Sequence, residues 1–126
     1  MMSTLSLVAL GGAFGAVLRY LSGVALLKLA GPTEFPFTII LVNVLGSFLM
    51  GLAAVAVAQR EMPFLHPLLM TGVLGGFTTF SAFSLEAVTL FERGEITAAL
   101  LYVAISVIGA IAALGFGLWC ARAMFL

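Results

Sequence analysis

The chain has 126 residues, of which 63% are hydrophobic and 8% are charged, whereas a soluble domain carries about 25% charged residues. This composition excludes a soluble globular domain, and at about 20 residues per membrane span it predicts an all-α membrane protein with four transmembrane helices in one domain, residues 1–126. The apolar composition makes the lipid bilayer an expected partner. The net charge is zero and no basic tract is present, so neither nucleic acid nor anionic lipid headgroups are expected as partners.

The first predicted span covers residues 5–29, and no signal-peptide cleavage site follows it, so it is expected to be retained. Gly11 and Gly15 have the GxxxG spacing that lets another helix approach closely. Arg19 lies inside the span, where a charged side chain costs a few kcal/mol. Two roles are open for Arg19: its long side chain reaches an interface and anchors the helix, or its charge concentrates anions in a vestibule.

The second predicted span covers residues 36–58 and carries an asparagine, Asn43, in its apolar interior. The side-chain amide of Asn43 offers two N–H donors and a carbonyl acceptor. It either makes a hydrogen bond to another helix, worth about 0.6 kcal/mol in membranes, or donates to something inside a pore. Ser47 and Gly51 form a small-residue edge suited to helix packing.

The third predicted span, residues 67–91, combines a glycine pair, Gly75-Gly76, with adjacent hydroxyls, Thr78-Thr79. Each glycine weakens a helix by about 1 kcal/mol relative to alanine, and threonine hydroxyls can bond to carbonyl groups in place of the usual ladder. This pattern predicts a helix break at membrane depth. Irregular backbone is tolerated there only when it is buried in protein or lines a wet cavity, and its freed carbonyls are suited to binding a cation.

Two phenylalanines, Phe80 and Phe83, follow the break at i, i+3 and share one helix face. Such a pair usually serves packing. Its ring edges are, however, the positive rim of the aromatic quadrupole and can face an anion. Hydroxyl side chains flank the rings: Thr79, Ser81 and Ser84. Glu86, one turn after Phe83, is either a structural hydrogen-bond partner or a group at a pore mouth.

The fourth predicted span covers residues 96–119 and has few polar groups beyond Tyr102 and Ser106, which are four apart and share a face. A tyrosine near a helix end is typical of the aromatic belt at the membrane interface. Ala110, one turn further on, is apolar.

The run GGFTTFSAFS, residues 75–84, resembles the signature GGxTTFSTFS of the Fluc (CrcB) family of bacterial fluoride channels. Supporting matches lie in the other spans: Gly11-Gly12 with Gly15 and Arg19, Asn43 with Gly46 and Ser47, and Tyr102 with Ser106. The resemblance covers essentially the whole chain. One residue departs from it, because Ala82 occupies a position that is usually threonine.

The resemblance implies a channel that exports fluoride passively across the bacterial inner membrane as an antiparallel, dual-topology homodimer. The fluoride path would be lined by Asn43, Phe80, Phe83, Thr79, Ser81, Ser84, Tyr102 and Ser106. Arg19 would lie in a vestibule. The backbone carbonyls of Gly75 and Thr78 would hold a structural Na⁺ at the dimer centre. Hard oxygen ligands without a carboxylate also suit a monovalent cation better than Ca²⁺ or Zn²⁺.

The basic residues near the span ends agree with insertion in both orientations. Arg60 and Arg122 lie on the side of the N-terminus, and Lys28 and Arg93 lie on the other. The positive-inside rule therefore has no excess on either side to act upon.

Other functions fit the sequence less well. It shows no second acid near Glu86, no histidine pair, no Ser-His-Asp set in a polar context and no phosphate-binding loop, so no enzyme activity is expected. A small proton-coupled multidrug exporter is the alternative, but such exporters resemble one another in a glutamate in the first helix, where this chain has Arg19. A passive subunit would not need the Gly-Gly and Thr-Thr break.

Overall fold

The computed structural model describes residues 2–126, and this part of the chain is helical apart from short connections. The elements in chain order are α1 (Met2–Ala30), α2 (Phe37–Gln59), the π-helix η1 (His66–Leu74), α3 (Gly75–Phe77), α4 (Ser81–Glu92) and α5 (Ile96–Phe125). Within the described residues, four helical segments are long and apolar enough to cross a membrane: Ser3–Ala30, Phe37–Gln59, His66–Glu92 and Ile96–Phe125. The predicted all-α class with four such helices is confirmed.

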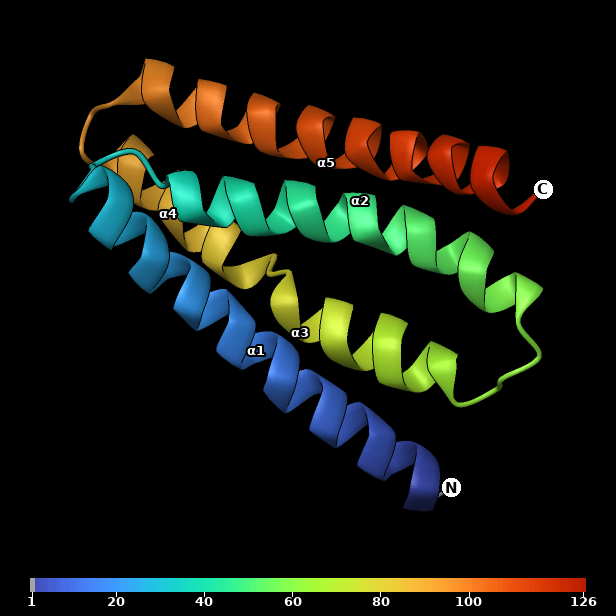
Figure 1. Ribbon diagram of the computed structural model, residues 1–126. Helices are drawn as coiled ribbons and strands as arrows, with labels where there is room; N and C mark the ends of the chain where they lie inside the picture. The colour runs from blue at the N-terminus through green and yellow to red at the C-terminus, as the bar shows by residue number, and fades with distance from the viewer. Residues whose placement is uncertain (1) are drawn as a thin grey trace.

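The four segments run alternately in opposite directions, and both chain ends lie at the same end of the bundle (Figure 1). The helices form two layers. In one, α1 packs against the third segment through η1 and α3; in the other, α2 packs against α5, and α4 contacts α5 near its start. Helix α5 continues to Phe125, beyond the predicted end at 119, because residues 120–125 contain no glycine or proline to stop it.

The contact between α1 and the third segment is made by glycines on both sides. A Cβ atom placed on Gly72 would lie 2.9 Å from the Cα of Gly11, and one on Gly76 would lie 3.1 Å from the Cα of Gly12. The two backbones therefore touch, as the GxxxG spacing in α1 predicts. Gly75, beside Gly76, keeps helical torsion angles, φ −63° and ψ −37°. The glycine pair thus allows close packing here without itself breaking the helix.

Helices α2 and α5 pack side by side in the same direction, as Figure 1 shows. A Cβ on Gly117 would lie 3.2 Å from the Cα of Gly51, and a Cβ on Gly109 would lie 3.2 Å from Cγ2 of Val44. These two close approaches define the register of the pair. The Gly51 contact also agrees with the packing role expected of that residue on the second span.

The buried apolar cluster lies where α4 meets the start of α5. It consists of Phe83, Leu90, Ala99 and Tyr102, with Phe35 and Ile39 among the residues packed around it. Many other large apolar side chains are exposed on every long helix, as lipid-facing residues would be.

Replacing Gly15 with valine is expected to destabilise the fold. A Cβ on Gly15 would overlap the carbonyl oxygen of Val73 and lie 2.8 Å from the backbone nitrogen of Phe77. Backbone atoms cannot rotate away. The substitution should therefore cost at least about 1–3 kcal/mol of folding free energy, the usual cost of overpacking. Thermal unfolding in detergent measures the loss. Gly12→Val on the same helix is the matched control, because a Cβ there meets nothing within 4 Å; equal stability of the two variants would contradict the prediction.

Candidate functional site

The third segment is interrupted after α3. Thr78 has extended torsion angles, φ −84° and ψ 159°, and helix resumes only at Ser81. We call residues 78–80 the interruption; it follows the glycine pair and includes the threonine pair from which a break was predicted. Locally, both the backbone N–H of Thr78 and its hydroxyl donate to the carbonyl of Leu74, at 3.1 Å and 2.9 Å. The hydroxyl thus bonds to a backbone carbonyl, as the sequence suggested.

Asn43 on α2 holds the interruption through two hydrogen bonds. The backbone N–H of Thr79 donates to Asn43 Oδ1 at 2.8 Å, and Asn43 Nδ2 donates to the carbonyl of Thr79 at 2.9 Å. Helix α2 comes this close because Gly46 has no side chain: a Cβ there would overlap Cγ2 of Thr78. Of the two roles open for Asn43, the interhelical hydrogen bond is therefore present in the structure.

These side-chain bonds deprive two backbone carbonyls of their helical donors. In a continuous α-helix the Thr79 N–H would donate to Gly75 and the Ala82 N–H to Thr78. Here the Thr79 N–H is taken by Asn43, and the Ala82 N–H donates to Thr79 Oγ1 at 3.2 Å. The carbonyls of Gly75 and Thr78 are those predicted to hold Na⁺. Among residues 2–126, no group of three His, Cys, Asp or Glu side chains is placed to hold a metal ion.

The two phenylalanine rings, Phe80 at the end of the interruption and Phe83 in α4, differ in their surroundings. Their centroids are 5.4 Å apart, so they share a face as predicted. Phe83 is 8% exposed and packs on the ring of Tyr102 at 5.4 Å, whereas Phe80 is 76% exposed. Packing inside this chain explains why Phe83 is a buried aromatic residue. It does not explain why Phe80 presents an exposed ring.

A cavity of about 420 Å³ lies between α2, the interruption, the start of α4 and α5, and we call it the site cavity. Its lining includes five of the residues predicted for the ion path: Asn43, Thr79, Phe80, Phe83 and Ser106. The remaining lining residues are Gly46, Ser47, Met50, Thr78, Val107, Ala110, Ile111 and Leu114. Segments far apart in the sequence thus bring most of the predicted polar and aromatic groups to one place.

The other predicted site residues lie outside the lining of the site cavity. Ser81 is exposed at the start of α4, and the hydroxyl of Ser84 donates to the carbonyl of Phe80 at 2.9 Å. Tyr102 is fully buried beneath Phe83. Arg19 is half-buried on α1, and Glu86 is half-buried on α4. Within the described part of the chain, the buried hydroxyls of Tyr102 and Ser106 have no hydrogen-bond partner.

Two of the lining residues that sequence reasoning did not assign to the ion path are Ser47 and Met50 on α2. Both follow Asn43 on one helix face, at i+4 and i+7. This spacing could have identified them, but Ser47 was interpreted as a packing residue.

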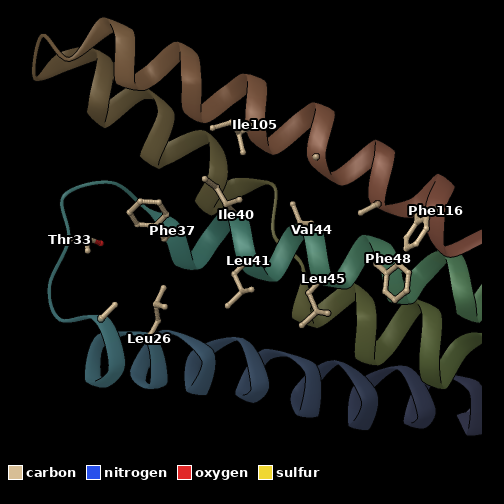
Figure 2. Close-up of a pocket in the computed structure, with 13 residues that line it drawn as sticks. Leu26, Thr33, Phe37, Ile40, Leu41, Val44, Leu45, Phe48, Ile105 and Phe116 are labelled. Carbon is tan, nitrogen blue, oxygen red and sulfur yellow. The ribbon is translucent and has the colours of Figure 1, made fainter.

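A second, larger cavity is an apolar groove of about 930 Å³ along α2, between the end of α1 and α5. Figure 2 shows its wall, where carbon side chains such as Phe37, Leu41 and Phe48 line the groove and Thr33 supplies a hydroxyl near one end. Such a wall offers an ion almost no donors to replace water. The site cavity is therefore the better candidate for an ion path.

Comparisons with known proteins give a consistent result. Residues 6–118 match the family model described as "CrcB-like protein, Camphor Resistance (CrcB)". The chain is 59% identical over 126 residues to the fluoride-specific ion channel FluC of Roseobacter denitrificans, covering 99% of this chain and 100% of the relative. It is 57% identical over 122 residues to that of Ruegeria sp., covering 97% of each chain. The corresponding protein of Agrobacterium fabrum is 49% identical over 126 residues, covering 98% of this chain and 100% of the relative.

Proposed function

This chain belongs to the CrcB family, and we propose from this premise that it is a fluoride-selective channel through which F⁻ leaves the bacterial cytoplasm passively. It is a multi-pass bacterial membrane protein. Its family consists of ion channels, which are not a class of enzyme. The observation that carries the proposal is the site cavity, where the amide of Asn43, the hydroxyl of Ser106 and the two phenylalanine rings meet beside the interruption.

Fluoride is small and strongly hydrated, so a narrow pore must replace its water with other donors. The amide of Asn43 has two N–H groups; one donates to Thr79, and the other remains for an ion in the site cavity. The buried hydroxyl of Ser106 is a second donor. The edges of Phe80 and Phe83 add weak positive contacts. Several weak contacts in series suit conduction, because an ion must leave each site as readily as it enters.

The test is fluoride efflux from liposomes that contain the purified protein, recorded with a fluoride electrode. Fluoride should leave down its gradient without a proton gradient, and liposomes loaded with chloride should release far less anion. Absence of fluoride efflux would overturn the proposal. A proton-coupled multidrug exporter, the alternative considered from the sequence, would release no fluoride from the fluoride-loaded liposomes.

We also propose that the channel is an antiparallel homodimer. The balanced basic residues support insertion in both orientations. Arg60 follows the end of α2 and Arg122 lies in the last turn of α5; both helices end where the two termini lie (Figure 1). Lys28 in the last turn of α1 and Arg93 after α4 lie at helix ends on the opposite side of the bundle. The exposed ring of Phe80 is also explained if a partner covers it. Reporter fusions to the C-terminus are expected to give signals on both sides of the membrane. A signal on one side only would contradict dual topology.

A structural Na⁺ fits the backbone of the interruption. The carbonyls of Gly75 and Thr78 lack the helical donors that Asn43 and Thr79 Oγ1 have diverted, and Gly75 is exposed on the single chain. Two chains together would offer four such oxygens, and a monovalent cation would compensate their unpaired dipoles.

Replacing Na⁺ on both sides of the liposomes by a large organic cation is therefore expected to slow fluoride efflux by about tenfold or more, a change of about 1.4 kcal/mol. Returning Na⁺ should restore the rate, which is the internal control. Efflux at an unchanged rate after prolonged exchange would count against the Na⁺ site.

A further inference from the structure

Two facing helix stripes form the long walls of the site cavity. From α2 come Asn43, Ser47 and Met50, at i, i+4 and i+7; from α5 come Ser106, Ala110 and Leu114, at i, i+4 and i+8. Each stripe begins with a polar side chain. On α5 the polar character ends after Ser106, and on α2 it continues one turn further, to Ser47.

The register of α2 and α5 places Ser47 opposite the apolar part of the α5 stripe. Val44 contacts α5 at Gly109, and Gly51 contacts it at Gly117. Since the two helices run in the same direction, Ser47 lies level with the stretch of α5 between these glycines. That stretch contains Ala110 and Leu114, neither of which can donate a hydrogen bond.

Within the described residues 2–126, the hydroxyl of Ser47 has no hydrogen-bond partner. Serine in a helix commonly bonds to the carbonyl four residues earlier, as Ser22 does to Leu18 at 2.8 Å. Within residues 2–126 Ser47 makes no such bond. Of the threonine hydroxyls at the site cavity, that of Thr78 donates to the carbonyl of Leu74, whereas Thr79 Oγ1 accepts from the Ala82 N–H and lies 3.5 Å from Ser81 Oγ.

We propose that Ser47 contacts fluoride directly and supplies the donor at the level of the site cavity where α5 presents Ala110 and Leu114. This inference rests on the proposed channel function and extends the path beyond Asn43 and Ser106. One helical turn, about 5.4 Å, separates Asn43 from Ser47. An ion that leaves the Asn43 amide therefore meets the Ser47 hydroxyl before it must cross a wall of Met50, Ile111 and Leu114.

The test compares a single variant on α2 with a double variant that restores a hydroxyl on α5, the opposite wall of the site cavity. Ser47→Ala is expected to lower fluoride efflux about tenfold, which corresponds to about 1.4 kcal/mol. Adding Ala110→Ser to that variant returns a hydroxyl to the same level from α5 and should bring the rate back to within about threefold of wild type, or about 0.6 kcal/mol. Ser22→Ala is the matched control, since its hydroxyl is bonded on α1, and it should conduct as wild type.

The outcomes separate this inference from the function on which it rests. If the wild-type protein releases fluoride and Ser47→Ala does so at the same rate, Ser47 is a packing residue and the inference is wrong. A slow Ser47→Ala that Ala110→Ser does not repair also overturns it, because the loss would then come from packing on α2. No efflux from the wild-type protein overturns the channel function itself and the inference with it.

Discussion

Phe83→Ile and Phe80→Met are each expected to lower fluoride efflux from liposomes by about 100-fold, or about 2.7 kcal/mol, while the protein stays folded. Both replacements keep an apolar side chain of similar bulk, and such exchanges usually cost less than about 1.5 kcal/mol of stability. What they remove is the positive ring edge. Efflux should therefore fall far more than the unfolding temperature.

The controls decide between conduction and packing. Phe14 on α1 is exposed and does not line the site cavity, so Phe14→Ile and Phe14→Met should conduct at the wild-type rate. Each variant is first shown to elute as the wild-type protein does. Phe80→Met is the more telling variant, because the Phe80 ring is exposed in the single chain and cannot be explained as core. Wild-type efflux from both folded site variants would mean that the rings only pack and that the ion path lies elsewhere.

Composition alone determines the fold class, because four apolar stretches of about 20 residues in a nearly uncharged chain have few alternatives to membrane-spanning helices. Spacing within one helix also gives reliable results. Gly11 and Gly15 do meet another helix closely, and Phe80 and Phe83 do share a face. These features depend only on helix periodicity, which the sequence contains.

Features that depend on contacts between two distant segments could be predicted less well from the sequence. The sequence pattern attributes the break to Gly75-Gly76 together with Thr78-Thr79. The glycines stay helical, and the interruption falls at the threonines, where Asn43, 36 residues away, takes the Thr79 N–H. Likewise, Gly76 is needed because the backbone of Gly12 lies against it. Helix weakness is a local property, whereas the place of the interruption depends on which neighbour supplies a competing partner. The π-helix η1, next to this glycine contact, was not predicted from the sequence either.

Asn43→Ala tests that competition directly, and it should lower fluoride efflux by about 100-fold or more, equivalent to about 2.7 kcal/mol. Removing the amide leaves the N–H and carbonyl of Thr79 without partners, and Thr79 is buried. An unsatisfied buried group costs about 1–3 kcal/mol. The Thr79 N–H would then donate to the carbonyl of Gly75, its partner in a continuous helix. That repair would straighten the interruption, shift Phe80 out of the site cavity and occupy an oxygen proposed to hold Na⁺.

The two classes of variant should therefore differ in more than rate. Phe80→Met should lose conduction with nearly unchanged thermal stability, and Phe83→Ile should lose conduction with a stability loss below about 1.5 kcal/mol. Asn43→Ala should lose both properties more strongly, because Asn43 holds the backbone as well as facing the ion. Gln59→Ala is the matched control: it removes the same amide from an exposed position at the end of α2 and should leave both properties unchanged. If Asn43→Ala conducts poorly but unfolds at the wild-type temperature, Asn43 acts only as a fluoride donor, and the interruption is held by the bonds of Thr78 and Thr79 within its own segment.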